Sequence, residues 1–220
     1  MKGVRVLHIP CYHKKGALEA LERNIALLSK YDRIGLVSTA QHANQLQRLA
    51  DFIQSKGKEA HVGGQVLGCN QEAAFSLDHK VDAFLYVGSG LFHPLGISAK
   101  AEKPVIILNP YSGTMSQLPS SARERWLRRQ KGRIAKAYAA ETYGVLVSTK
   151  TGQFSLGRAF DVIERLKSRG KRAFLFAGEE LNPANLLPFR VDCWVNTACP
   201  RIVDDEFDKP VVNAAELNLV

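Results

Sequence analysis

The feature that most constrains the fold of this chain is an internal repeat. Three short segments return in the same order at nearly one offset, which chance rarely produces. They are Leu-Val-Ser-Thr at 36–39 and 146–149, Ser-Lys/Arg-Gly-Lys at 55–58 and 168–171, and Val-Asp at 81–82 and 191–192. The sequence therefore predicts two copies of one domain, which we assign to residues 1–110 and 111–220.

Each copy has the same order of predicted elements. An apolar run rich in β-branched residues precedes a polar loop and an amphipathic helix, and Gly57 or Gly170 stands where that helix is expected to end. Apolar side chains at helical spacing mark the two helices: Leu46, Leu49, Phe52 and Ile53 in the first copy, and Phe160, Val162, Ile163 and Leu166 in the second. A second strand, another helical stretch and the Val-Asp strand follow in each copy.

This alternation predicts an α/β fold with two homologous parallel-sheet domains in tandem. Ahead of the first repeat, a strand is expected over residues 4–9 and a helix over residues 15–29. Ligands of open parallel sheets bind beyond the carboxyl ends of the strands. Polar or glycine-rich loops follow the predicted strands at 39–42, 63–69, 88–96, 149–153 and 197–201. Tight turns explain one such loop, but five indicate a shared site.

The four cysteines form no local zinc or thioredoxin motif. No Cys-x-x-Cys pair occurs among Cys11, Cys69, Cys193 and Cys199. The N-terminus has no signal-peptide pattern, and no apolar run is long enough for a membrane span, so we expect a cytoplasmic chain without a membrane partner. Disulfides are rare in that compartment, and each cysteine by itself is typical of a small buried hydrophobe.

Positive charge is concentrated in one segment. The formal net charge of +9 comes from 30 basic and 21 acidic residues, and the stretch 121–136 contains seven basic residues against Glu124 alone. The basic residues are Arg123, Arg125, Arg128, Arg129, Lys131, Arg133 and Lys136. A solvated helix face explains this run, and so does a docking surface for an acidic partner or RNA.

Four segments occur together in an order that is peculiar to one family. They are Gly-Gln-Val-Leu-Gly-Cys at 64–69, Val-Gly-Ser-Gly-Leu-Phe-His-Pro-Leu-Gly-Ile at 87–97, Ser-Thr-Lys-Thr-Gly-Gln at 148–153 and Val-Asn-Thr-Ala-Cys-Pro-Arg at 195–201. Over nearly its whole length the chain resembles the diphthamide-biosynthesis radical enzymes, the 2-(3-amino-3-carboxypropyl)histidine synthases. The resemblance implies related α/β domains around a 4Fe-4S cluster, with one ligand cysteine from each of three domains.

The resemblance assigns Cys69 and Cys199 as cluster ligands, from the second and third family domains. We expect these two thiols to face a common space. A first family domain does not precede them, so the resemblance implies a separate first-domain polypeptide, a fragment, or a degenerate homologue. Cys11 or Cys193 as the missing ligand is the weaker alternative.

The implied activity is the first step of diphthamide biosynthesis. S-adenosylmethionine is cleaved at the reduced cluster, and its 3-amino-3-carboxypropyl group is transferred to a histidine of translation elongation factor two. An electron donor and a homo- or hetero-oligomer belong to this expectation. No side chain is assigned as catalytic, because the cofactor carries the chemistry. The residues expected to bind S-adenosylmethionine are Gln41, Gln65, Gly88, Ser89, Gly90, His93, Gln153 and Arg201.

Each of these residues also has a structural interpretation. The 88–90 segment is equally typical of a plain turn, His93 of a structural histidine, and Arg201 of a surface ion pair with Asp204 or Asp205. We also expect an exposed apolar patch at 92–97, formed by Phe92, Leu95 and Ile97, where another domain would dock. The rival functions are a non-catalytic partner subunit and, ranked last, a nucleic-acid-binding module that uses the basic stretch. Hydrolase, kinase and metalloprotease motifs do not occur.

Overall fold

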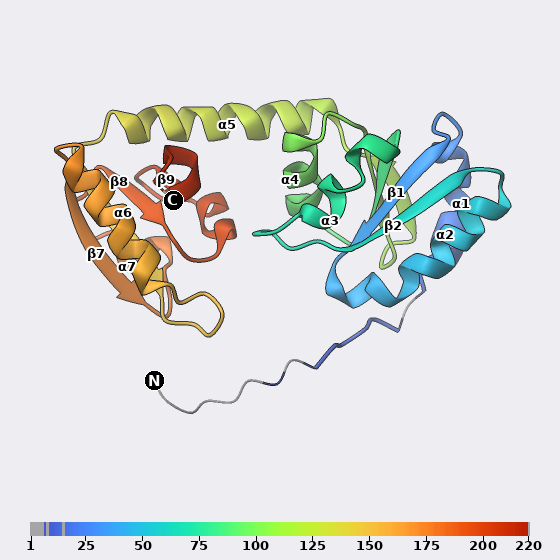
Figure 1. Ribbon diagram of the computed structural model, residues 1–220, viewed down its shortest axis with the longest axis horizontal. Coiled ribbons are helices and arrows are strands. Elements are labelled where there is room, and N and C mark those ends of the chain that lie inside the picture. The colour runs from blue at the N-terminus through green and yellow to red at the C-terminus, as the bar shows by residue number, and fades with distance from the viewer. Residues whose placement is uncertain (1–6, 8, 15, 220) are drawn as a thin grey trace. The chain divides into compact units, whose positions relative to one another are not determined.

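The computed structural model describes residues 7, 9–14 and 16–219 and divides the chain into two compact units. Unit 1 comprises Met1–Glu124 and unit 2 comprises Arg125–Val220. The division lies inside helix α5 (Ser120–Tyr138), which continues from one unit into the other (Figure 1). The start of α5 belongs to unit 1 because Arg123 Nε donates to the carbonyl of Ser98 at 2.7 Å. The compact units therefore divide inside α5 and not at the repeat boundary near residue 110.

Unit 1 has a five-stranded sheet in the order β2-β1-β3-β4-β5. The first four strands are parallel, and β5 runs antiparallel to β4. Its elements are α1 (Leu18–Asn24), η1 (Ile25–Leu28), β1 (Arg33–Ser38), η2 (Ala40–Gln45), α2 (Leu46–Ser55), β2 (Glu59–Gln65), α3 (Glu72–Phe75), η3 (Asp78–Lys80), β3 (Ala83–Val87), α4 (Phe92–Lys100), β4 (Val105–Asn109) and β5 (Thr114–Gln117).

Unit 2 has a four-stranded parallel sheet in the order β7-β6-β8-β9. After α5 its elements are β6 (Thr142–Ser148), α6 (Leu156–Ser168), β7 (Arg172–Gly178), α7 (Pro183–Leu186), β8 (Cys193–Asn196), η4 (Pro200–Asp204), β9 (Val211–Asn213) and η5 (Ala214–Leu217). Strands β6 to β9 repeat the order of β1 to β4. The predicted fold, two parallel-sheet α/β domains in tandem, is confirmed.

Helices cover both faces of each sheet, because alternate strand residues point to opposite sides. In unit 1, Ile34 and Leu36 of β1 pack in one apolar cluster with α1 and α2, whereas Val37 packs in another with α3 and α4. In unit 2, Val145 of β6 packs in a cluster with α6, and Leu146 packs in a cluster with α7 and η4. Each unit is thus a three-layer sandwich with its own core.

The repeated Val-Asp segment anchors the start of the first strand in each unit. Asp82 Oδ2 accepts the backbone N–H of Arg33 at 3.0 Å, and Asp192 Oδ2 accepts that of Thr142 at 2.8 Å. Asp82 also pairs with the Arg33 guanidinium at 2.6 Å. Both aspartates therefore fix the parallel alignment of neighbouring strands.

A second shared device is a glycine beneath an aromatic ring. A β-carbon at Gly144 would collide with the buried Trp194 ring. At the corresponding Gly35, a β-carbon would lie 3.1 Å from the nearest atom of the Phe84 ring. Because the Trp194 indole is larger than the Phe84 ring, glycine is required more strictly at position 144 than at position 35.

Three expectations about local structure change. The strand expected over 4–9 falls mainly outside the described residues; Leu7 and Ile9, which are described, are exposed and lie in no strand. The helix expected over 15–29 is divided into α1 and η1, and Lys15 is outside the described residues. Phe160 is 49% exposed, because Ala159, not Phe160, joins the buried face of α6.

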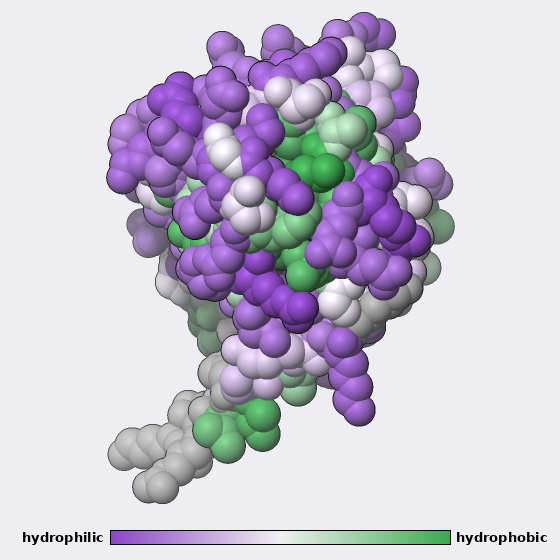
Figure 2. All heavy atoms as spheres, turned by 90° about the vertical axis from the view of Figure 1, so that its right-hand side faces the viewer, coloured by the Kyte–Doolittle hydropathy of each residue, from purple (hydrophilic) through white to green (hydrophobic). Residues whose placement is uncertain are grey.

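The face of unit 1 seen in Figure 2 is mainly hydrophilic around an apolar area. Scattered exposed apolar side chains, such as Leu27 at 45% and Val62 at 41%, are ordinary for a folded surface. Among the described residues, none of the helices has both the length and the hydropathy that crossing a bilayer requires.

Candidate functional site

Three loops of unit 1 lie at the carboxyl edge of its sheet. They follow the neighbouring strands β1, β2 and β3, and Ser38, the last residue of β1, pairs with Gln65, the last residue of β2. The segment expected as a loop from residue 63 begins inside β2, so only its part after Gln65 is a loop. The chain passes from β1 outward to β2 and back to β3, and ligands of such sheets bind at this kind of switch point.

Cys69 is exposed on a tight turn after β2. Leu67 and Asn70 close the turn with reciprocal backbone hydrogen bonds, 2.7 Å from Leu67 N to Asn70 O and 3.2 Å from Asn70 N to Leu67 O. The side-chain oxygen of Asn70 also accepts the backbone N–H of Glu72 at 2.9 Å. The backbone of the turn is therefore well held, and the Cys69 thiol remains accessible for reaction or metal binding.

Two glycines bring this turn against α4. A β-carbon at Gly68 would collide with the Phe92 ring, and one at Gly96 would collide with the side-chain amide of Gln71. The Phe92 ring leaves no room for a side chain at Gly68, whereas the flexible Gln71 amide would have to move aside for one at Gly96. The position of Cys69 is therefore set by packing against α4 as well as by the turn itself.

Tyr86 brings together several of the expected site residues at the end of β3. Its hydroxyl donates to the carbonyl of Ser89 at 3.4 Å and lies 3.3 Å from Nδ1 of His93. A β-carbon at Gly88 would lie 2.7 Å from the same hydroxyl. Burial raises the pKa of Tyr86 to about 12, so the phenol is neutral. The structural role expected for His93 is therefore present, and sequence analysis missed Tyr86.

The remaining expected residues of unit 1 lie open at the same edge. Gln41, on η2 after β1, and Gln65 are both exposed. Gly90 has a φ of +75°, and a β-carbon there would meet nothing within 4 Å, so backbone conformation alone requires the glycine. Their roles in ligand binding stay predictions.

A cavity of about 320 Å³ lies at the carboxyl edge of unit 2. It contains three of the expected site residues, Gln153, Cys199 and Arg201, which come from the loops after β6 and β8. The loop after β7 completes the wall. The lining residues are Ser148, Lys150, Gln153, Glu179, Glu180, Leu181, Asn182, Cys199, Arg201, Ile202 and Asp205.

Charges of both signs line this cavity. Lys150 Nζ lies 2.8 Å from Glu180 Oε1, and this hydrogen bond raises the pKa of the lysine. Glu179, Arg201 and Asp205 contribute further charged groups to the wall. Such a wall can bind a ligand that carries both a carboxylate and an ammonium group.

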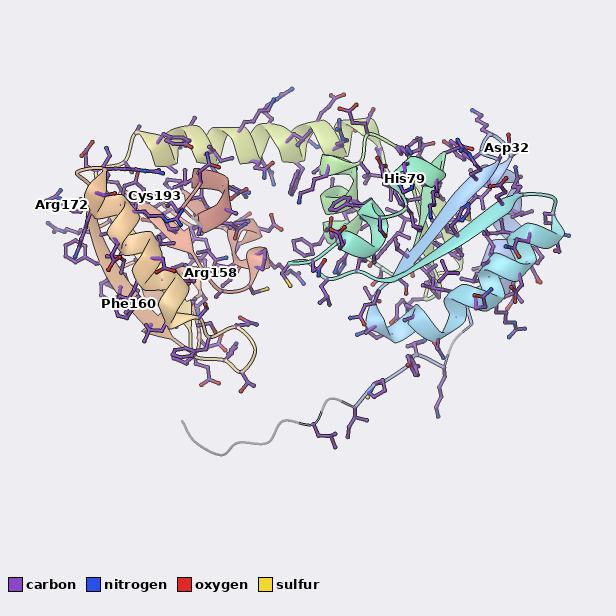
Figure 3. The ribbon with its side chains drawn as sticks, viewed as in Figure 1. Asp32, His79, Arg158, Phe160, Arg172 and Cys193 are labelled. Carbon is purple, nitrogen blue, oxygen red and sulfur yellow. The ribbon has the colours of Figure 1, made fainter. Side chains whose placement is uncertain are left out.

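The other two cysteines differ from Cys69 and Cys199. Cys193 is fully buried within unit 2, whereas Phe160 and Arg172 lie at the outside of the same unit (Figure 3). Burial raises the pKa of the Cys193 thiol to about 12, so it is a structural side chain. Cys11 is exposed in the N-terminal segment before α1.

The exposed apolar patch expected at 92–97 is wrong, because none of its three side chains is exposed. Ile97 is fully buried in a core cluster, and Leu95 packs against the same cluster. Phe92 is half-buried over Gly68. The exposed apolar side chains beside the Cys69 turn are instead Leu67 and Leu91, each 47% exposed.

The basic stretch forms most of α5. Arg133 binds within unit 2, where its Nη1 donates to the carbonyl of Val203 at 2.8 Å. The exposed basic side chains are Arg125, Arg128, Arg129, Lys131 and Lys136. A docking role for them stays a prediction.

Within the part of the chain that the structure describes, no three His, Cys, Asp or Glu side chains gather closely enough to hold a metal ion.

The sequence model of one protein family, described as putative diphthamide synthesis protein, matches residues 1–220. The chain belongs to the diphthamide synthesis family. The resemblance found in the sequence motifs is thereby confirmed.

The relatives have one name in archaea and a subunit name in animals. The chain is 34% identical over 230 residues to the 2-(3-amino-3-carboxypropyl)histidine synthase of Pyrococcus horikoshii, covering 99% of this chain and 66% of that protein. It is 29% identical over 229 residues to the synthase of Methanocaldococcus jannaschii, covering 98% and 62%. Subunit 1 of the human synthase is 29% identical over 195 residues, covering 83% and 43%.

A solved structure of this family has the same fold. Dph2 from Pyrococcus horikoshii with a 4Fe-4S cluster matches with a TM-score of 0.83 and 34% identity, covering 95% of this chain and 64% of that one. This chain therefore spans less than two thirds of the length of the relatives it matches.

The residues of this diphthamide synthesis protein fit part of a cluster site. Fe–S clusters are held by thiolates, and Cys69 and Cys199 are accessible thiols at the carboxyl edges of their own sheets. Cys193 is too deeply buried to serve. Each unit therefore has one accessible thiol at the carboxyl edge of its sheet, and the role of these two thiols as cluster ligands stays a prediction.

Proposed function

We propose that Cys69 and Cys199 hold one 4Fe-4S cluster, and that this chain transfers the 3-amino-3-carboxypropyl group of S-adenosylmethionine to a histidine of translation elongation factor two. The observation that carries the proposal is that the carboxyl edge of each unit bears one thiol, exposed at Cys69 and half-buried in a cavity wall at Cys199, in a member of the diphthamide synthesis family. The units correspond to the second and third family domains. The protein substrate places the reaction in the cytoplasm.

The reaction exchanges one bond for another. A bound cluster supplies one electron, originally from an external donor, to break a carbon–sulfur bond of S-adenosylmethionine, and it takes the electron back at the end. The side-chain carbon joins the imidazole ring of the acceptor, while methylthioadenosine and a proton leave. This chain's part is to bind, orient and exclude water.

The cavity of unit 2 suits the amino-acid part of S-adenosylmethionine. Arg201 is placed to bind the carboxylate, and Glu179 and Asp205 offer carboxylates for the ammonium group. Gln153 supplies a neutral donor and acceptor beside Cys199. In unit 1 the backbone N–H groups of 88–90, together with Gln41, Gln65 and His93, are proposed contacts for the same ligand.

A third thiolate comes from another polypeptide or domain in this proposal. Two thiolates hold a cubane weakly and leave two irons open, whereas three leave the single open iron that a coordinating substrate uses. The partner-subunit alternative also has a supporting observation, because animal relatives are named as subunit 1 of the synthase. In that case this chain supports a cluster and does not itself bind S-adenosylmethionine.

Anaerobic reconstitution separates these functions. The chain is supplied with iron and sulfide, with and without a co-purifying partner, and then with dithionite, S-adenosylmethionine and elongation factor two. Transfer appears as the mass of one 3-amino-3-carboxypropyl group on the factor. We expect weak transfer by the chain alone and strong transfer with the partner.

Two other outcomes contradict the proposal. Strong turnover by the chain alone, retained after Cys11→Ala and Cys193→Ala, shows that no additional thiolate is needed. Transfer with the partner that persists after Asp205→Asn, Glu179→Gln and Arg201→Gln together assigns S-adenosylmethionine binding to the partner. The matched control Glu141→Gln changes an exposed carboxylate of unit 2 that does not line the cavity.

A further inference from the structure

Cys199 is held by a partly buried series of hydrogen bonds that starts on α5. Its backbone carbonyl accepts two bonds, from Asn196 Nδ2 at 2.9 Å and from the backbone N–H of Ile202 at 3.1 Å. Pro200 follows and confines Cys199 to an extended backbone, with φ −65° and ψ 124°. The loop is thus fixed on both sides of the thiol.

Asn196 is the centre of this arrangement. It is the last residue of β8, it is 2% exposed, and its side chain makes three hydrogen bonds. Its Nδ2 donates to the carbonyl of Cys199 and to Oδ1 of Asn213, both at 2.9 Å, and its Oδ1 accepts the backbone N–H of Ala198 at 3.0 Å. A buried amide with both hydrogens donated has one favoured orientation.

The series of hydrogen bonds continues from Asn213 to helix α5. Asn213 donates its backbone N–H to Glu216 Oε2 at 2.7 Å, and Glu216 Oε1 accepts Nε2 of Gln130 on α5 at 2.7 Å. Asn213 and Glu216 also form the capping box of η5, so neither side chain is free to turn away. All these residues belong to unit 2.

Helix α5 reaches the loop by a second route. Arg133, three residues after Gln130, donates to the carbonyl of Val203 in η4, the turn that begins directly after Cys199. Gln130 therefore connects to the residue before the loop, and Arg133 to the turn after it. The same helix fixes both ends of the segment that contains the thiol.

We propose that Asn196, with Asn213 and Glu216 behind it, is the positioning residue that orients the Cys199 thiol toward a metal cluster. This deepens the proposed function and depends on it only for the identity of the ligand. The side chains act through the backbone of Cys199 and touch neither cluster nor substrate.

The test measures the thiol in the protein without cluster. Iodoacetamide labelling of the full chain is followed residue by residue by mass spectrometry, and Cys69 serves as the internal reference. Asn196→Ala frees the Cys199 carbonyl and the Ala198 N–H, and we expect Cys199 to react several-fold faster while Cys69 is unchanged. Asn196→Asp retains the shape and the bond from Ala198 but loses both donated bonds, so the same direction is expected.

The increase in Cys199 labelling should become smaller as the substituted residue lies further from Cys199 in the series of hydrogen bonds. Glu216→Gln replaces one of the two accepting carboxylate oxygens with an NH2 donor, and three hydrogen bonds separate it from Cys199, so a smaller increase is expected. Gln130→Ala should cause the smallest increase. Glu216→Gln also gives the test if Asn196→Ala does not fold. Asn24→Ala is the matched control, because Asn24 donates to the carbonyls of Ala20 and Gly113 in unit 1 and should leave Cys199 unchanged.

A second readout uses the reconstituted protein. Loss of iron to a chelator should be several-fold faster in Asn196→Asp than in the wild type, measured at a temperature at which both proteins are fully folded. Unchanged Cys199 labelling in folded Asn196→Ala and Asn196→Asp overturns the proposal. If the wild type binds no cluster, the proposed function fails, whereas the labelling result still decides whether Asn196 positions the thiol.

Discussion

In unit 1 the thiol at the carboxyl edge of the sheet, Cys69, follows the outer strand β2, whereas in unit 2 the thiol at that edge, Cys199, follows the inner strand β8. The strand of unit 1 that corresponds to β8 is β3, and at the repeat offset of 110 residues the counterpart of Cys199 is Ser89. Tyr86 and Asn196 correspond in the same way, and each donates to the carbonyl three residues further on.

The two units share the framework of their sheets and differ in the loops at the carboxyl edge. Strand order, the Val-Asp anchor and the glycine beneath an aromatic ring are common to both units. The loops beyond the strands differ, because their side chains face solvent or a cavity and are not constrained by a packed core. The same backbone position can therefore present a serine in one unit and a cysteine in the other.

The largest expected effect tests whether Cys69 and Cys199, which follow different strands in their units, bind the same iron cluster. Cys69→Ser and Cys199→Ser should each remove most of the iron bound after anaerobic reconstitution, because one thiolate holds a cubane much less firmly than two. Iron and sulfide content and the absorbance of the cluster measure the loss. Cys193→Ala should retain the iron, since that thiol is buried. Retention of iron by Cys69→Ser would make unit 2 the only unit that binds it.

The next effect concerns the shared glycine. Gly144→Ala pushes a β-carbon into the buried Trp194 ring and should lower the free energy of unfolding of unit 2 by about 3 kcal/mol. Gly35→Ala meets Phe84 at 3.1 Å, so unit 1 should change by less than about 1 kcal/mol. Denaturant unfolding measures both. Equal losses would show that the aromatic ring size does not distinguish the units.

The glycines that end α2 and α6 should behave alike. Gly57 has a φ of +79° and Gly170 a φ of +76°, and a β-carbon at either would meet nothing within 4 Å. Alanine at each should therefore cost about 1 kcal/mol, from backbone strain alone. Chemical denaturation of the two single variants checks this, and Gly157→Ala inside α6 should be neutral or stabilising. Clearly unequal losses at 57 and 170 would contradict the equivalence of the two helix ends.

The smallest effect depends on pH and salt. A hydrogen bond from the Arg33 side chain lowers the pKa of Asp82, and a hydrogen bond from the Thr142 backbone lowers that of Asp192. Because both pKa values lie below the ordinary 3.8, each aspartate stabilises the fold above that pH and loses the contribution as pH falls through its folded value.

Asp82→Asn and Asp192→Asn should therefore flatten the acid side of the stability curve, measured by thermal unfolding between pH 2 and pH 6. Added salt should weaken the Asp82 contribution more, since its ion pair with Arg33 is exposed to solvent. An equal salt response of the two variants would contradict the distinction between an ion-paired and a backbone-bonded anchor.

The sequence by itself determined the tandem α/β fold, because strand patterns and glycine helix ends recur in the same order at nearly one offset, and local residue chemistry specifies them. It also determined the family and which cysteines to examine. Gln153, Cys199 and Arg201 were three of the expected site residues, and the structure brings them to one cavity. Local patterning could not separate Phe160 from Ala159 on α6, nor show that Ile97 is buried, because burial depends on the neighbouring layer.

Only the tertiary structure decided how Cys199 is held. Asn196, Asn213, Glu216 and Gln130 are spread over 86 residues of sequence, and each belongs to an ordinary residue type at an ordinary position. Their hydrogen bonds exist only after β8, β9 and α5 have packed and removed water from the amide of Asn196. A sequence pattern records the chemistry of neighbours along the chain, whereas a buried polar network depends on neighbours in space.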